Sequence, residues 1–246
     1  MEITFKGKDH KFAIPNDVIT GIYSSENIFD YKGTLIVDKE KVTNKNKEEI
    51  LKGIIVVENK ILDTSFTTLE EYMNYYIEVN NLNIKDPDKK IMGSLKIVGL
   101  KEKVLKKSIS ALSSTEKSLA SLATALLTNP KEIILKDFFI YFDIKLEKKI
   151  YRLLMELNDK YKIGIILYDN DIEKLYKYAS YVIIIKKDFL IEGATKEVFN
   201  DANLLLEHGV DLPDIVEFTY KARKIGAKID YHRDIRDIIK DIYKHI

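Results

Sequence analysis

The stretch LSSTEKSLASLATALLTNPKEIIL, residues 112–135, carries the clearest structural signal in the sequence. Ser113 and Glu116 have the spacing of a capping box, in which the side chain of each residue accepts a hydrogen bond from the backbone N–H of the other. Leucine and alanine then recur at helical spacing until Asn129-Pro130, and a short apolar run follows. The stretch therefore predicts a capped helix, a break and a buried strand.

The chain after this stretch alternates between strand and helix patterns. Strands are predicted at 132–135, 164–167 and 181–185, helices at 146–160 and 172–179, and a returning strand at 189–192. Strands separated by helices of this length indicate right-handed βαβ units and a mostly parallel sheet. We therefore expect an α/β fold.

The chain before it has a more mixed pattern. Strands are predicted at 2–5, 17–23, 33–38 and 52–59, a helix from a cap at Thr67 or Thr68 to Val79, and a further helix over 89–105 that is interrupted at Gly99. The patterns divide the chain into an α/β core of residues 1–66 and 130–199, a helical subdomain of residues 67–129 and a helical C-terminal extension of residues 200–246. In that extension one apolar helix face holds Ile235, Ile238, Ile239, Ile242 and Ile246. The sequence leaves two interpretations of this face open, dimerisation and packing on its own domain.

Composition excludes several classes of site. The 246 residues are 46% apolar, enough for a sizeable core, and 40 Lys and Arg nearly balance 39 Asp and Glu, so no nucleic-acid partner is expected. Cysteine is absent, and the four histidines lack metal-ligand spacing; His208 and His232 are expected at the surface. Apolar runs are too short to cross a bilayer, so we expect a cytoplasmic protein.

The order of segments from about Val98 onward resembles ATP-binding cassette (ABC) ATPases, in particular the ATPase subunits of energy-coupling-factor importers. The matching segments are VGL (98–100), residues 112–135 in place of the signature motif LSGGQ with its helix and the Walker B strand, DNDIEKLYKYASYVIIIKKDFLIEGATKEVF (169–199) and LLLEHGVDLPDI (204–215). The resemblance implies a P-loop-NTPase-like ABC ATPase core with a mostly parallel sheet, a small helical subdomain and the helical C-terminal extension. The segment FAIPNDVITGIYSS (12–25) is similar to the family's strand into its phosphate loop.

The phosphate loop itself is missing from the sequence. GxxxxGK[ST] cradles phosphate with successive backbone N–H groups at a helix N-terminus, and its lysine neutralises charge. The expected place has GIYSSENIFDYKGTLIVD (21–38), which contains no such loop and is too short for the helix that follows it. Lys32 as a relic of the lysine is the weaker interpretation, because a strand pattern follows it directly. We expect that the element is deleted.

The Walker B strand departs from the family as well. The resemblance places Lys136 at the aspartate that holds Mg²⁺ and Asp137 at the catalytic glutamate. A cation at the first position repels a metal ion, and a one-residue shift would put Phe138 at the base position. The family's Q-loop glutamine would lie near Val57 or Glu58, where the sequence has no glutamine.

Three further motif positions are implied by the resemblance. Ser113 retains the signature serine, but its glycines become Ser114 and Thr115 and its glutamine becomes Glu116, so a pure helix cap is the favoured interpretation. Asp143 matches the D-loop aspartate, with a helix N-cap as an equal alternative. Asn170 occupies the position of the family's switch histidine, and its amide side chain cannot act as an imidazole.

The resulting hypothesis is a degenerate ABC-type subunit that binds partners without hydrolysing ATP. The implied partners are a second ABC ATPase subunit, intact or identical, and a transmembrane transporter component, which would place the chain on the inner face of the cell membrane. No cofactor is expected. The alternative is an active or nucleotide-binding ATPase in which Lys136 neutralises phosphate and Asp137 positions water, and only then are ATP and Mg²⁺ required.

Overall fold

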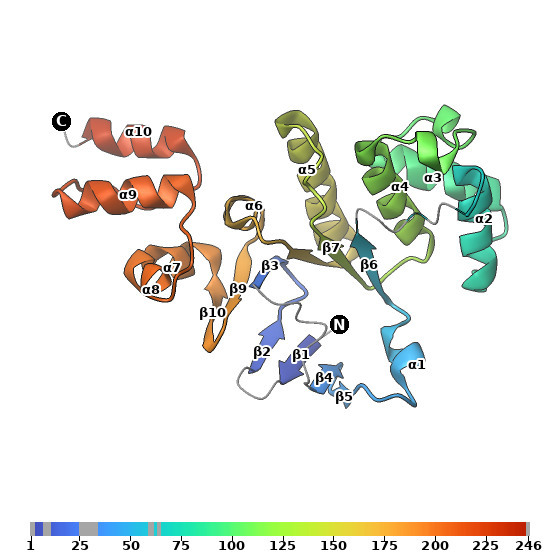
Figure 1. Ribbon diagram of the computed structural model, residues 1–246, viewed down its shortest axis with the longest axis horizontal. Coiled ribbons are helices and arrows are strands. Elements are labelled where there is room, and N and C mark those ends of the chain that lie inside the picture. Colours follow the sequence, from blue (N-terminus) through green and yellow to red (C-terminus); the bar gives the residue numbers. More distant parts are fainter. Residues whose placement is uncertain (1–2, 7–10, 25–33, 59–61, 63–64, 245–246) are drawn as a thin grey trace. The chain divides into compact units, whose positions relative to one another are not determined.

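The computed structural model describes residues 3–6, 11–24, 34–58, 62 and 65–244 (Figure 1). The chain forms two compact units: Val42–Ile166 is the first, and Glu2–Lys41 together with Leu167–Ile246 is the second. The predicted three-part division into core, helical subdomain and extension stays a prediction. The two units divide the chain at other boundaries and do not test it. Each unit is described by itself.

The first unit combines parallel strands with helices. In chain order it contains α1 (Lys47–Leu51), β6 (Ile54–Glu58), α2 (Leu69–Val79), α3 (Pro87–Val98), the 3-10 turns Glu102–Val104 and Ile109–Ala111, α4 (Ser114–Leu127), β7 (Glu132–Lys136), α5 (Ile144–Tyr161) and most of β8 (Gly164–Tyr168). Strand β7 lies between β6 and β8, and β6 pairs with β7 in parallel so that Glu58 is opposite Lys136. Helix α4 packs against α3 and β6, and its Ala120, Leu122 and Ala123 are fully buried.

Local sequence signals set the helix ends in this unit. Thr68 caps α2 through a capping box with Glu71, and Ser113 caps α4 in the same way with Glu116. Helix α3 is shorter than predicted: Gly99 has a left-handed backbone (φ 83°) at its C-cap and ends the helix there. The segment predicted to continue it forms a 3-10 turn instead.

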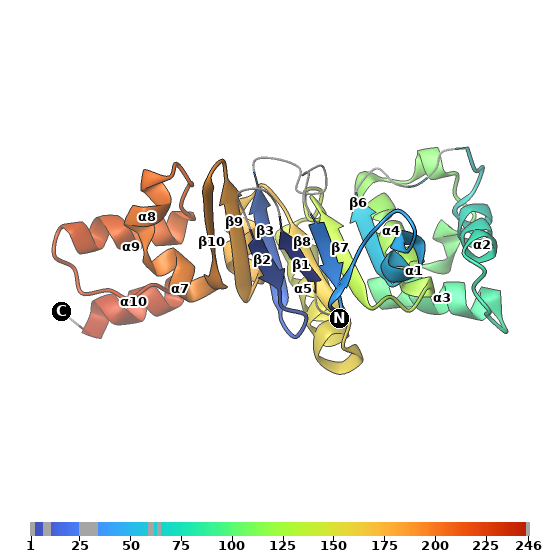
Figure 2. The same ribbon diagram turned by 90° about the horizontal axis from the view of Figure 1, so that it is seen from below.

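The second unit holds the remaining strands and helices (Figure 2). Its strands are β1 (Ile3–Lys6), β2 (Lys11–Ile14), β3 (Ile19–Ser24), β4 (Thr34–Val37), β5 (Glu40–Lys41), β9 (Tyr181–Lys186) and β10 (Phe189–Ala194). Its helices are α6 (Ile172–Tyr178), α7 (Thr195–Asn200), α8 (Ala202–Glu207), α9 (Asp214–Lys224) and α10 (Ile235–Lys244). Strands β2, β1, β4 and β5 form an antiparallel sheet in that order, whereas β3 pairs with β9 in parallel and β10 returns antiparallel to β9.

The predicted α/β class is confirmed. The parallel pairs β6–β7 and β3–β9 agree with the predicted mostly parallel sheet, although the individual pairs were not predicted. The antiparallel sheet of the second unit was not predicted as a sheet, because strands of two to four residues show no clear periodicity.

Candidate functional site

The carboxyl end of β7 carries Lys136 and Asp137, which the resemblance places at the positions of the family's metal-binding aspartate and catalytic glutamate. Ile133, Ile134 and Leu135 are buried, and Lys136 follows at the strand end with its Nζ 3.2 Å from Oε1 of Glu58. Asp137, directly after the strand, has a left-handed backbone (φ 48°) and is half-buried. At this edge of the sheet an ammonium group therefore stands against a carboxylate of the neighbouring strand.

The loop after Asp137 is held by aromatic packing. Phe138, Phe139 and Phe142 turn inward and meet edge to face, with ring centroids 5.1–5.8 Å apart. Asp143 then begins α5, because its Oδ1 accepts a hydrogen bond from the Leu146 N–H at 2.8 Å. The N-cap interpretation of Asp143 is therefore confirmed, whereas a D-loop role stays a prediction.

The N-terminus of α4 is closed by polar contacts. Ser113 Oγ accepts from the Glu116 N–H at 3.1 Å, and Glu116 Oε2 accepts from the Ser113 N–H at 3.0 Å. Lys107 Nζ donates to Glu116 Oε1 at 2.7 Å, and this hydrogen bond, more than any other contact, lowers the pKa of Glu116. The Thr115 hydroxyl donates to the carbonyl of Tyr141 at 2.8 Å and so links this helix start to the loop after β7.

Asn170 lies in the second unit, in the turn between β8 and α6, and is exposed. On one side of it, Asp169 Oδ1 accepts from the Asp171 N–H at 2.8 Å; on the other, Asp171 Oδ1 accepts from the Glu173 N–H at 3.1 Å and caps α6. The structure thus brings Ser113, Lys136, Asp137 and Asp143 into one unit and leaves Asn170 in the other.

The predicted absence of the phosphate loop concerns residues 25–33, including Lys32, and these lie outside the described residues. The described flanks are β3, which ends at Ser24, and β4, which begins at Thr34. The deletion of the loop therefore stays a prediction from the sequence.

The chain is similar in sequence to known transport ATPases. Residues 17–137 match the family described as ABC transporter. Over 241 residues the chain is 25% identical to the energy-coupling factor transporter ATP-binding protein EcfA2 of Caldanaerobacter subterraneus subsp. tengcongensis, an alignment that covers 90% of this chain and 84% of that protein.

Residues 17–137 belong to the ABC transporter family. A second relative, the protein EcfA1 of Clostridium perfringens, is 26% identical over 163 residues, which cover 66% of this ABC-type chain and 58% of the relative. Among solved structures, cbiO1 from Clostridium perfringens, described as part of the ABC transporter complex cbiONQ, has a TM-score of 0.67 at 20% identity and covers 89% of this chain and 98% of its own. A dimeric bacterial ABC transporter cassette has a TM-score of 0.65 at 18% identity, with 78% and 98% covered. These structures show that the fold is that of an ABC ATPase.

The first unit of this ABC-type chain also contains a groove that sequence reasoning missed. Two adjoining cavities of about 370 and 470 Å³ share Lys90, Ile97 and Leu126. Their other apolar lining residues are Ile84 in the first cavity and Leu153, Leu157, Tyr161 and Ile163 in the second. The groove therefore runs along α3, the end of α4 and α5, with an apolar floor.

Gly93 lies in the middle of α3 and lines this groove. A Cβ atom built on Gly93 would meet nothing within 4 Å, so no contact inside the chain requires a glycine there. Glycine within a helix is less stable than alanine by about 0.5–1 kcal/mol. Its position was visible in the sequence, but only the structure shows the open space beside it.

Among the described residues, no three His, Asp or Glu side chains gather in an arrangement that would hold a metal ion. Within the same part of the chain, no helix is both long and apolar enough to cross a bilayer. His208 is exposed as predicted, whereas His232 is half-buried and paired with Asp241, which corrects the expectation of a surface residue.

Proposed function

We propose that this chain is an ATPase-type subunit of an energy-coupling-factor-like importer that acts by binding its partners and does not hydrolyse ATP. The observation that carries the proposal is the ion pair between Lys136 and Glu58 at the end of β7. Mg²⁺ requires oxygen ligands, and the ammonium group at this position supplies a positive charge instead. The residues around β7 thus do not fit a bound Mg²⁺ ion.

The start of α4 gives independent support. A phosphate binds at a helix N-terminus when free backbone N–H groups point at it. In α4 the N–H groups of Ser113 and Glu116 are both bonded within the capping box, and the Glu116 carboxylate stands beside them. Under the proposal Ser113 and Asp143 act as helix caps, and Asp137 and Asn170 occupy catalytic positions without their chemistry.

The groove along α3 supplies a surface for the transmembrane partner. Relatives are named as transporter ATP-binding proteins, and one solved relative is described as part of a transporter complex. An amphipathic helix placed on the apolar floor could approach the backbone closely at Gly93, where no side chain intervenes. The second partner is another ABC ATPase subunit, either a copy of this chain or an intact relative.

Nucleotide binding directly tests the proposal that this chain does not hydrolyse ATP. Isothermal titration of the chain with ATP and Mg²⁺ is expected to give no heat of binding, and wild type, Lys136→Ala and Lys136→Asp are all expected to lack turnover. An intact ABC ATPase measured in parallel is the positive control. Micromolar binding together with turnover that Lys136→Ala abolishes would establish the alternative, in which Lys136 neutralises phosphate and Asp137 positions water.

Substitutions of Gly93 test the groove. Gly93→Ala is expected to stabilise the isolated chain by about 0.5–1 kcal/mol, because it removes backbone freedom from the unfolded state without a clash. Gly93→Leu is expected to leave the fold intact but to abolish co-purification with a co-expressed transmembrane component. Met155→Leu, on the exposed side of α5, is the matched control. Undiminished co-purification of Gly93→Leu would exclude this groove as the docking surface.

A further inference from the structure

Helix α10 carries its apolar side chains on one broad face. At about 100° per residue, Ile235, Ile238, Ile239, Ile242 and Tyr243 fall within an arc of about 140°. The middle of this arc is formed by Ile235, Ile239 and Ile242. A helix with such a face ordinarily packs against its neighbours through the middle of the apolar face.

In this structure α10 packs through one edge of the face instead. Ile238 is 0% exposed and Asp241, three residues later, is 9% exposed. Ile235, Ile239 and Tyr243, one row at spacing i, i+4 and i+8, are 54%, 44% and 76% exposed. Ile242, also in the middle of the face, is half-buried, so the buried side of α10 overlaps its apolar face only in part.

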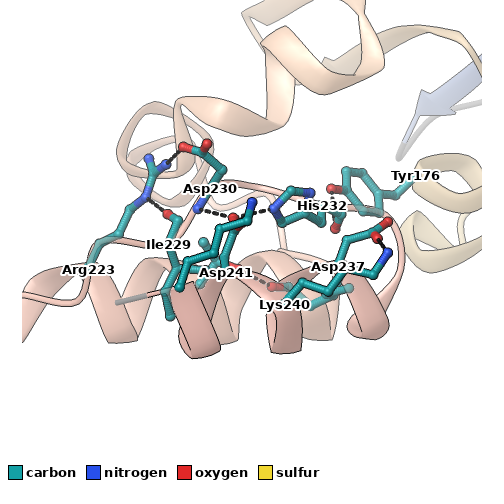
Figure 3. A network of polar contacts seen from close by, with 11 residues as sticks. Tyr176, Arg223, Ile229, Asp230, His232, Asp237, Lys240 and Asp241 are labelled. Carbon is teal, nitrogen blue, oxygen red and sulfur yellow. Dashed lines mark hydrogen bonds and ion pairs between the residues drawn. The ribbon is translucent and has the colours of Figure 1, made fainter. Parts of the chain in front are cut away.

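Asp241 is held on the buried edge by a set of polar contacts (Figure 3). Its Oδ2 lies 2.5 Å from Nε2 of His232, which donates because an ionised carboxylate only accepts, and it also accepts from the Asp230 N–H at 3.3 Å. Lys244 Nζ donates to Oδ1 at 3.1 Å. The buried edge of α10 thus carries an aspartate placed among donors.

The segment that supplies His232 also has contacts that do not involve α10. The carbonyl of His232 accepts from the hydroxyl of the buried Tyr176, on α6, at 3.0 Å. Arg223, on α9, donates from Nε to the Ile229 carbonyl at 2.6 Å, and Arg233 donates to the carbonyl of Ala179 at 2.7 Å. Contacts with α6 and α9 therefore help to position His232.

We propose that the His232–Asp241 pair is a rotational latch, which holds α10 by its edge and keeps Ile235, Ile239 and Tyr243 facing outward. Without the pair, burial of Asp241 is offset only by the exposed Lys244 and the Asp230 N–H, whereas burial of Ile235 and Ile239 remains favourable. The helix then rolls about its own axis and covers its apolar row.

Single cysteines report the rotation, because the chain has no cysteine of its own. The Ile239→Cys variant places a thiol in the outward row, and Asp237→Cys places one on the other side of α10. Adding His232→Ala is expected to slow alkylation of the first thiol about fivefold or more and to leave the second unchanged or faster. Lys244→Ala keeps the His232–Asp241 pair and is expected to change neither rate.

Two outcomes overturn the latch. Faster alkylation of both thiols would show that α10 detaches, and unchanged rates would show that the pair does not set its rotation. If His232→Ala fails to fold, His232→Phe, which keeps a ring of similar shape without the donor, is judged by the same two rates. The assay uses the isolated chain without nucleotide or partner, so it gives its answer whether or not the proposed importer function holds.

Discussion

The Lys136–Glu58 pair and the His232–Asp241 pair both set a carboxylate against a nitrogen donor, yet they are built differently. Lys136 and Glu58 are neighbours on adjacent strands, and their side chains are 29% and 36% exposed. Asp241 is 12% exposed by side chain and accepts from His232, Lys244 and the Asp230 backbone. The Lys136–Glu58 pair determines the charge at a sheet edge that would keep its structure without the pair. The His232–Asp241 pair instead determines the rotation of α10.

The largest effect is expected at Asp241. Asp241→Ala leaves the donors of the half-buried His232 and of the Asp230 backbone without the charged acceptor that they share, and the loss of hydrogen bonds to a charged group is destabilising. We expect the thermal midpoint to fall by several degrees and amide exchange in α10 to accelerate. Glu58→Ala is the matched control in the other pair, and an equal loss from both variants would break the comparison.

The second-largest effect is expected at low pH, which should destabilise the same helix, α10. The hydrogen bond from His232, followed by that from Lys244, lowers the pKa of the Asp241 carboxyl. A lowered carboxyl pKa contributes stability that is fully present above the usual carboxyl range and is lost as pH falls through the folded value. We therefore expect amide exchange in α10, corrected for its intrinsic pH dependence, to rise as pH falls below about 4. In Asp241→Asn this rise should disappear, and its persistence would assign the acid effect to other groups.

Substitution of Ser113 tests whether this residue only caps α4 or also has a role with nucleotide. Ser113→Ala should destabilise the chain by about 1 kcal/mol, the usual effect of losing an N-cap side chain. Thr68→Ala removes the equivalent cap of α2 and should have the same effect in urea denaturation. A normal stability loss together with a changed affinity for ATP in Ser113→Ala alone would show that Ser113 has kept a role with nucleotide.

The smallest effect is expected at Lys136. Lys136→Met keeps the length of the side chain and removes a partly exposed ion pair, so the free energy of unfolding should fall by only about 0.5 kcal/mol. A loss several times larger, measured by urea denaturation, would mean that this pair organises the end of β7 as the His232–Asp241 pair organises α10.

Features that depend on neighbouring residues were predictable from the sequence. The cap at Ser113 and the alternation after β7 follow from spacing alone, and the cap of α2 was narrowed to Thr67 or Thr68, of which the structure has Thr68, because such contacts span a few residues. The pairing of Lys136 with Glu58 was not predictable, although both positions were singled out, because it requires that β6 and β7 be adjacent and in the observed register.

The C-terminal extension shows the same limit. Periodicity identified the apolar face of α10, and the structure divides it, with Ile238 buried and Ile235 and Ile239 left outward. The sequence did not predict this division, because it depends on His232, nine residues before Asp241 and placed by contacts with other helices.

The left-handed backbone of Asp137 has a consequence for the family's catalytic glutamate at this position. A glutamate at position 137 would inherit φ 48°, a conformation that aspartate and asparagine tolerate better than longer side chains do. Under the proposal that this chain does not hydrolyse ATP, exchanging the acid alone would therefore add strain without adding activity. An engineer who wanted hydrolysis would have to redesign the turn together with the side chain.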